Sequence, residues 1–200
     1  MSETRGLLIA AATAHLDRYG LEGLTLRQIA RDVGVSHGAP RRHFAGLAQL
    51  LAAVAAAGFD GLTSAVTAQA DASGERGPDR LRAAGRGYVE FAVANRGAFE
   101  LMFRPELLDR TDPDYLRASI EAYDTLSTLT AAAQSSGWRA DHDHAALTGV
   151  LWAGVHGIAS LWIQGSLPLA TAIDDLDPFL VMFQSDLAGL PESTGLPEST

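Results

Sequence analysis

The stretch from Thr25 to Phe44, which reads TLRQIARDVGVSHGAPRRHF, constrains the fold of this chain more than any other segment. Apolar residues at positions 26, 29, 30 and 33 recur with the spacing of one helix face, which predicts a short helix. Thr25 and Gln28 stand in the capping-box arrangement at its start, and Gly34 suits the left-handed residue at its end. Ser36 can cap a second helix after a three-residue turn. Together these features are typical of a DNA-binding helix-turn-helix.

The predicted second helix carries two adjacent cations. It begins near His37 and reads HGAPRRHF, and Pro40 suits its first turn, so its start lies at one of the residues 37–39. Arg41 and Arg42 then lie near the positive end of the helix dipole, which disfavours a cation by roughly 0.3–1 kcal/mol. A DNA phosphate or the acceptor edge of a guanine reverses that sign. We therefore interpret the pair as DNA-binding rather than merely solvated.

The pattern T-x-x-x-I-A-x-x-V-G-V-S-x-G-x-x-x-x-H-F, which follows an N-terminal amphipathic helix, resembles the DNA-binding domain of TetR-type transcriptional repressors. The resemblance covers about residues 5–60. It departs at two positions, because many members of that family have Tyr where Arg41 stands and Lys where Leu47 stands. Both residues usually contact the phosphate backbone. Arg41 can still reach a phosphate, but Leu47 cannot replace an ammonium group, so operator affinity transfers less well than the fold.

Eight residues of this stretch are the candidate DNA contacts. Those expected to contact phosphates are Thr25, Arg27, Ser36 and Arg42. Those expected nearest the base edges are His37, Gly38, Ala39 and Arg41. His43 and Phe44 are expected to hold the fold instead. A dimer would place two such elements about 34–36 Å apart, one turn of B-DNA, so we expect double-stranded DNA with a near-palindromic operator.

The net charge of −9 argues against a protein that coats nucleic acid without specificity. The charges are unevenly distributed, however. Residues 1–46 hold six arginines and four acidic residues, whereas the rest of the chain holds nine arginines and twenty acidic residues. A mildly basic head on an acidic body suits a site-specific reader, because repulsion keeps the body off the duplex. We expect modest non-specific binding that depends strongly on salt.

Helical periodicity and helix breakers predict an all-α fold of about nine helices: a three-helix helix-turn-helix head and a helical body. The first helix, about residues 4–19, should bury Leu8, Ala12, Leu16 and Tyr19. The later helices are predicted at about 47–70, 78–95, 97–104, 114–136, 142–164 and 177–188, with a loop at 105–113. The domains are then a DNA-binding domain at 1–46, a ligand-binding and dimerisation domain at 47–188, and a tail at 189–200. The tail contains GLPEST twice and is expected to be disordered.

The segment from Ala145 to Ile163 contains no charged residue. Its length alone suits a transmembrane helix, but it includes several glycines and His156, and no Arg or Lys flanks it closely. We therefore interpret it as a helix buried on several sides, not as a membrane span. One face can line the subunit core and another a partner subunit, because small residues allow close helix approach. These small residues are Gly149, Ala153, Gly154 and Gly157.

Within this segment, Trp152-x-x-x-His156-Gly157 resembles the Trp-His-Gly signature of one class of TetR-type C-terminal domain. The resemblance implies an all-helical ligand-binding body. It also implies a homodimer that forms through the last two long helices, about 142–164 and 177–188.

Aromatic and neighbouring side chains of the body are the candidate effector contacts. The candidates are Tyr88, Phe99, Met102, Phe103, Tyr123, Trp152 and His156. Core packing is the alternative explanation for each of them. His156 is the sharpest candidate, because an imidazole on an apolar helix needs a hydrogen-bond partner, which Tyr88, Tyr123, a ligand or the other subunit can supply. Apolar walls with few polar groups suit a small hydrophobic or amphipathic effector.

Other chemistries have less support in the sequence. The chain has no cysteine and no secretory signal, so we expect a cytoplasmic protein. The run Asp141-His142-Asp143-His144 suggests a metal site, but side chains two apart point to different sides of a helix and no second His or Cys cluster accompanies them. We expect Asp141 to cap a helix there and expect no metal. The sequence contains no catalytic Ser-His-Asp motif and no phosphate-binding glycine loop, so we predict no enzyme activity and no cofactor.

The leading hypothesis is a homodimeric, ligand-responsive repressor. The alternative is an all-helical small-molecule-binding protein or enzyme that has lost DNA recognition. Leu47 and the acidic total favour the alternative, whereas Arg41, Arg42 and the capping signals oppose it. A membrane-associated regulator is a more distant third interpretation.

Overall fold

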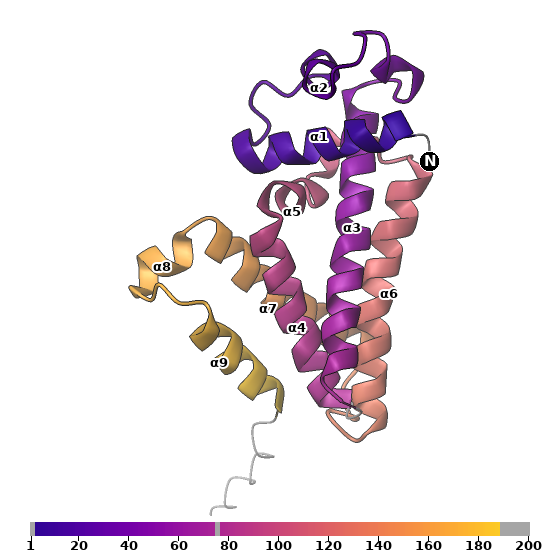
Figure 1. The fold of residues 1–200 in the computed structure, drawn as a ribbon. Coiled ribbons are helices and arrows are strands. Elements are labelled where there is room, and N and C mark those ends of the chain that lie inside the picture. The colour runs from indigo at the N-terminus through magenta and orange to yellow at the C-terminus, as the bar shows by residue number, and fades with distance from the viewer. Residues whose placement is uncertain (1–2, 75–76, 189–200) are drawn as a thin grey trace, which may run out of the picture. The chain divides into compact units, whose positions relative to one another are not determined.

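The computed structural model describes residues 3–74 and 77–188, and over those residues every regular element is a helix (Figure 1). The α-helices are α1 (Glu3–Tyr19), α2 (Leu26–Val33), α3 (Leu47–Ala72), α4 (Gly77–Ala94), α5 (Arg96–Met102), α6 (Pro113–Ser135), α7 (His144–Ile163), α8 (Ser166–Thr171) and α9 (Asp177–Ala188). Two 3-10 turns, η1 (Pro40–Arg42) and η2 (Pro105–Leu107), complete the described chain. The predicted all-α fold is confirmed. The duplicated GLPEST segment lies outside the described residues.

The described residues form two compact units. The first takes in those within 1–65 and 90–125, and the second those within 66–89 and 126–200. The boundary between the units falls within α3, α4 and α6, so each of these helices contributes to both. The predicted boundary at residue 46 divides the expected DNA-binding domain from the expected ligand-binding domain. It is a functional division, not one between the two compact units, and it stays a prediction.

In the first unit, α1 packs against both α2 and α5 (Figure 1). Leu8, Ala12 and Leu16 are buried as predicted. The expectation for Tyr19 is wrong, because this last residue of α1 is 55% exposed. Its ring lies under the guanidinium of Arg18, with 5.1 Å from the guanidinium carbon to the ring centre, instead of entering the core.

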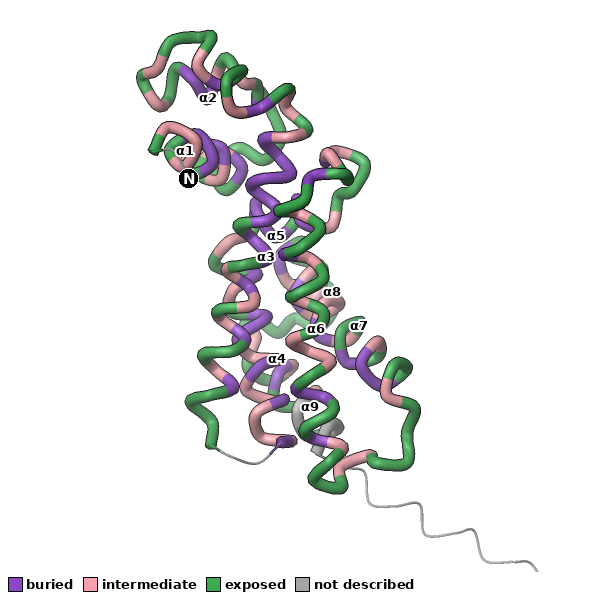
Figure 2. The backbone as a smooth tube through the Cα atoms, turned by 90° about the vertical axis from the view of Figure 1, so that its right-hand side faces the viewer, coloured by how far each residue is buried: buried purple, intermediate pink, exposed green. Residues whose placement is uncertain are grey.

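The part of α3 that belongs to the first unit forms its centre. Residues 50–56 are buried without interruption, which Figure 2 shows as a continuous purple stretch. A helix that is apolar on all sides is stable in water only where neighbours cover every side. One turn further on, the rings of Phe59 and Phe103 meet edge to face at 5.6 Å. The sequence Leu-Leu-Ala-Ala-Val-Ala-Ala therefore specifies a core helix.

In the second unit, α7 packs against α8 and α9. The approach of α9 depends on Gly154, because a Cβ atom at this position would lie 2.4 Å from Cε2 of Phe183. The rings of Trp162 and Phe179 also meet, with 6.2 Å between their centres. One of the predicted small residues of α7 thus allows close packing within the subunit.

Two helices, α3 and α7, are long and apolar enough to cross a membrane by length and composition. Two such helices are only weak evidence for a membrane protein, since the core helix of a soluble protein passes the same test. For α3 the core explanation is direct, because 61% of its most apolar stretch is buried inside the protein.

Candidate DNA-binding surface and effector site

Helix α2 begins and ends as its sequence predicts. Thr25 has an extended backbone, and its hydroxyl accepts a hydrogen bond from the backbone N–H of Gln28 at 3.1 Å. Gly34 ends the helix with a left-handed backbone at φ 74°. The side chain of Gln28 does not complete a capping box. It donates to Asp32 Oδ1 at 2.7 Å and accepts from Arg31.

The segment after α2 differs from the prediction. Instead of an α-helix that begins near His37, a turn leads into the single 3-10 turn η1. Pro40 explains the difference, because it has no N–H to donate to the carbonyl of Ser36 four residues earlier. The N-cap position of η1 is occupied by Ala39 rather than Ser36, and the segment closes with a hydrogen bond from Phe44 N to Pro40 O at 2.8 Å. We refer to residues 36–44 as the recognition segment.

Within the recognition segment, buried anchors flank exposed cations. Pro40 and Phe44 are buried, and Phe44 is only 1% exposed. Arg41 and Arg42 lie between them and are exposed. Of the other predicted DNA contacts, Ala39 is half-buried. The remaining ones are exposed: Thr25, Arg27, Ser36, His37 and Gly38. Their contacts with DNA stay a prediction, but each exposed side chain is accessible to a duplex.

In the second unit, three of the predicted effector residues form one polar cluster. The hydroxyl of Tyr88 lies 2.9 Å from Nδ1 of His156, so of the partners left open for this imidazole the structure selects Tyr88. Ser160 Oγ lies 3.2 Å from Nε2 of the same ring, and Trp152 also hydrogen-bonds Tyr88. We assign the chain of bonds as Tyr88 O–H to Nδ1 and Nε2–H to Ser160, which gives the neutral ring one acceptor and one donor.

Burial sets the protonation of this cluster. It raises the pKa of the Tyr88 phenol well above its usual value, and the hydrogen bond from Trp152 offsets only part of that rise. Burial also lowers the pKa of His156, since the charged imidazolium loses hydration. Both groups are therefore neutral at pH 7.

A small apolar cavity of about 40 Å³ adjoins Tyr88. Its walls come from α3, α4, α6, α7 and α9, and the lining residues are Val66, Leu81, Ala84, Gly85, Tyr88, Leu126, Leu151, Val155 and Phe183. Ligand pockets usually measure about 300–1,000 Å³. An effector of ordinary size would therefore have to displace some of these side chains.

The other four predicted effector residues belong to the first unit. Phe99 and Met102 are buried, and Phe99 packs against Phe103 with 5.3 Å between the ring centres. The contacts of these residues agree with core packing, which was the alternative explanation for them. Tyr123 is largely exposed. A role of these four residues in effector binding stays a prediction.

The acidic and histidine side chains at the start of α7 form hydrogen bonds within the protein. Asp143, not Asp141 as expected, caps the helix by accepting from Ala146 N at 2.8 Å. Asp141 instead contacts His142 at 2.8 Å. The ring of His144 lies 2.9 Å from both Ser127 Oγ and Gln134 Oε1. Within the described residues, no group of three or more metal-binding side chains gathers here or elsewhere.

The outward faces of α7 and α9 carry exposed apolar side chains. On α9 these are Val181 and Met182, which is 70% exposed, and on α7 they include Val150, which is 68% exposed. Gly157 lies seven residues from Val150 and so on the same side of α7. An added Cβ at Gly149 or at Gly157 would meet no atom within 4 Å. Unlike Gly154, these two glycines are not required for packing within the subunit.

A helix-turn-helix head with exposed arginines, joined to an all-helical body, defines a DNA-binding transcriptional regulator. Comparison with known families identifies which one. Residues 8–54 match "Bacterial regulatory proteins, tetR family", and residues 81–181 match "Tetracyclin repressor-like, C-terminal domain". The chain therefore belongs to the TetR family, and the second match is compatible with the Trp-His-Gly class.

Solved structures support the same fold. A protein with unknown function from Rhodococcus sp. RHA1 is 29% identical with a TM-score of 0.82, and the match covers 94% of each chain. The fatty acid degradation regulator FadR from Bacillus halodurans is 13% identical with a TM-score of 0.74, covering 94% of this chain and 96% of that one. The TetR family regulator PfmR from Thermus thermophilus is 16% identical with a TM-score of 0.68, covering 96% and 98%. No curated protein sequence matches the chain.

Sequence reasoning gave no role to Arg5 or Gln49. Gln49 Oε1 accepts from Ala45 N at 2.7 Å and so satisfies a backbone donor just before α3. Gln49 stands four residues after Ala45 and close to the start of a predicted helix, and this position was an available signal for a capping contact. Arg5 lies over the ring of Phe44, and no local pattern in the sequence indicates this contact.

Proposed function

We propose that this regulator is a repressor that binds a near-palindromic operator as a homodimer and is released by a small hydrophobic effector. The observation that carries the proposal is the recognition segment, in which buried Pro40 and Phe44 fix the backbone while Arg41 and Arg42 stay exposed. Guanidinium groups bind phosphates and the acceptor edge of guanine. An exposed pair on a rigid anchor therefore suits a DNA groove.

The apolar faces of α7 and α9 support a homodimer. Val150, Val181 and Met182 would otherwise remain in water, and Gly149 and Gly157 leave room for a partner helix to approach closely. Exposed apolar surface of this kind marks interaction sites. TetR-family regulators bind DNA and typically act as dimers, so a second copy of this chain is the partner that we propose.

The cluster around Tyr88 and His156 supports an effector site in the second unit. Tyr88, which bonds to His156, lines an apolar cavity, and this combination suits an amphipathic molecule with one polar end. Release from DNA requires that the effector bind the free conformation more tightly than the DNA-bound one. An effector larger than the present cavity must displace the walls, and we propose that the free conformation permits this displacement more readily than the DNA-bound one.

DNase footprinting and mobility shifts on DNA upstream of the protein's own gene test the proposal. We expect saturable protection of two half-sites related by two-fold symmetry. The double variant Arg41→Ala/Arg42→Ala should lose this protection, whereas Arg96→Ala, which removes an exposed arginine from α5, should retain it. The absence of any saturable site at moderate salt would contradict the proposal and favour a helical binding protein that has lost DNA recognition.

A further inference from the structure

We propose that Arg5 is a positioning residue for DNA binding, which fixes the recognition segment to the first turn of α6. The inference rests on the proposed role of the recognition segment in reading DNA. Arg5 lies near the start of α1, and all the residues that it joins belong to the first unit.

The first contact of Arg5 is with the anchor of the recognition segment. Its guanidinium carbon lies 5.4 Å from the centre of the Phe44 ring, within the range of a cation–π interaction. The backbone N–H of Phe44 closes the turn on Pro40, directly after Arg41 and Arg42. Arg5 therefore covers the side chain whose burial determines where the two exposed arginines point.

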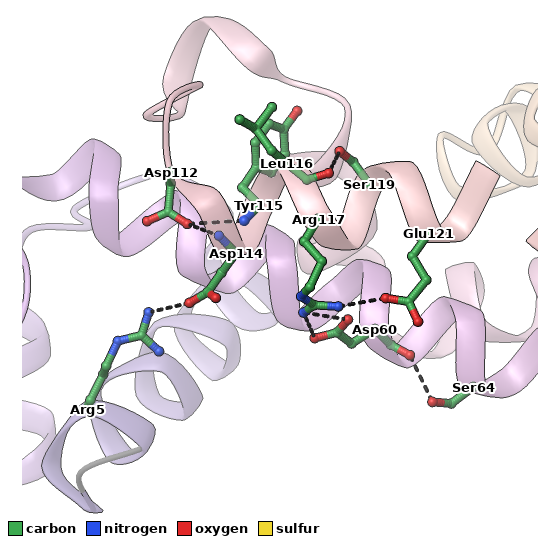
Figure 3. A network of polar contacts seen from close by, with 10 residues as sticks. All are labelled: Arg5, Asp60, Ser64, Asp112, Asp114, Tyr115, Leu116, Arg117, Ser119 and Glu121. Carbon is green, nitrogen blue, oxygen red and sulfur yellow. Dashed lines mark hydrogen bonds and ion pairs between the residues drawn. The ribbon is translucent and has the colours of Figure 1, made fainter. Parts of the chain in front are cut away.

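The second contact of Arg5 is with α6. Its Nη2 lies 3.3 Å from Oδ2 of Asp114, and the Arg5 side chain is only 22% exposed (Figure 3). Asp114 is itself held in place by the cap of α6. The carboxylate of Asp112 accepts from the backbone N–H groups of Asp114 at 3.0 Å and Tyr115 at 3.1 Å. The cap and the ion pair together determine where the guanidinium of Arg5 lies.

The first turns of α6 are also fixed to α3. Arg117 donates to both carboxylate oxygens of Asp60, at 3.0 and 2.9 Å (Figure 3). Asp109, in the loop before α6, donates its backbone N–H to Ala48 O at 3.1 Å. Arg5 thus joins the recognition segment to a turn that the Asp112 cap and the Asp109–Ala48 bond hold in place even without the Arg117–Asp60 pair. The Arg117–Asp60 pair bonds α6 to α3 rather than to the recognition segment, which makes it a matched control.

A purely structural role would give a different result from a positioning role. Asp114, the partner of Arg5, is 58% exposed, so water already solvates its carboxylate and the ion pair adds little to global stability. Asp114→Asn keeps the shape of the side chain but removes its charge, so the melting temperature should change little. The recognition segment should nevertheless open more often, because the guanidinium over Phe44 loses its ion pair with Asp114. Local opening of this kind is measured by amide exchange.

The test compares Asp114→Asn and Arg5→Gln with Asp60→Asn and Arg117→Gln in the full chain. For the first two variants, NMR should show that the amides of Arg42, His43 and Phe44 exchange at least about threefold faster, while the control pair changes them little. Operator affinity should fall by about three- to tenfold with the salt slope unchanged, because Arg5 contacts no phosphate in this role. The double variant Arg5→Gln/Asp114→Asn should be no worse than Arg5→Gln alone.

Unchanged exchange in Asp114→Asn and Arg5→Gln, or an equal change in the control pair, overturns the inference. A reduced salt slope in Arg5→Gln also overturns it, since that result means direct phosphate contact. The exchange measurement uses the free protein. It therefore decides the role of Arg5 even if the wild type binds no operator, a result that would contradict only the proposed function.

Discussion

The hydroxyl oxygen of Tyr88 on α4 lies 2.9 Å from Nδ1 of His156 on α7, although 68 positions separate the two residues in the chain. The bond joins two helices of the second unit through neutral side chains beside an apolar cavity. Protonation of the imidazole would convert Nδ1 from an acceptor into a donor and leave the Tyr88 proton without its acceptor. The stability of this unit should therefore depend on pH.

We expect the free energy of unfolding to decrease as the pH falls from 7 through about 6.5, the ordinary pKa of histidine. Burial lowers the pKa of His156 in the folded protein, so the unfolded chain takes up this proton first and is favoured at lower pH. Chemical denaturation at several pH values measures the slope. His156→Gln should make the slope shallower, because it removes the group that titrates differently in the two states.

Substitution of the two exposed arginines should separate affinity from specificity. We expect Arg42→Ala to weaken binding to all operator sequences alike and to reduce the salt slope by about one. Arg41→Ala should in addition change the preferred base at one position, at a cost of about 1–3 kcal/mol for the original base. Mobility shifts with a randomised operator measure both effects. Equal losses on every sequence for both variants would contradict the assignment of Arg41 to a base edge.

Gly154→Ala should destabilise the packing of α7 against α9. The new methyl group would lie 2.4 Å from Cε2 of Phe183, so the ring must move, and overpacking of this kind costs about 1–3 kcal/mol. Gly85→Ala on α4 is the control, since no atom lies within 4 Å of its added Cβ. It should be neutral or stabilising by up to about 1 kcal/mol, because alanine is the better helix former. Thermal unfolding of both variants checks the difference.

Charges placed on the outward faces of α7 and α9 should dissociate the proposed dimer. We expect Val150→Asp and Met182→Asp to be monomeric at concentrations where the wild type is dimeric, because a buried, unpaired carboxylate strongly disfavours association. Analytical ultracentrifugation distinguishes the two states. Ile120→Asp changes an apolar residue on α6 that is 58% exposed and should leave the dimer intact. A wild type that stays monomeric at every concentration would refute the proposed interface.

The two aspartates before α7 should differ in their effect on stability. Asp143→Ala removes the side chain that accepts from Ala146 N, and loss of such a cap costs about 0.5–2 kcal/mol. Asp141→Ala removes only an exposed contact with His142 and should change the unfolding free energy by less than about 0.5 kcal/mol. Urea denaturation of the two variants measures the difference. If Asp141→Ala lowered the unfolding free energy more than Asp143→Ala, Asp141 would be the cap instead.

The sequence predicted the elements that depend on neighbours along the chain. The Thr25 cap, the left-handed Gly34 and the position of α9 follow from interactions across a few residues, so their spacing is visible in the sequence. The predicted helix was too long at the recognition segment, where the structure has only the single 3-10 turn η1. The exposure of Arg41 and Arg42 could be predicted, because an arginine is almost never fully buried unless it is paired.

Only the tertiary structure decided the contacts between residues far apart in the sequence. It selected Tyr88 as the partner of His156, placed Arg5 over Phe44, and distinguished Gly154, which contacts Phe183, from Gly149, which has open space. Helical periodicity specifies which face of a helix is apolar, but not which helix covers that face or how the side chains interlock. Those choices depend on the packing of several helices at once, and no single stretch of sequence contains them.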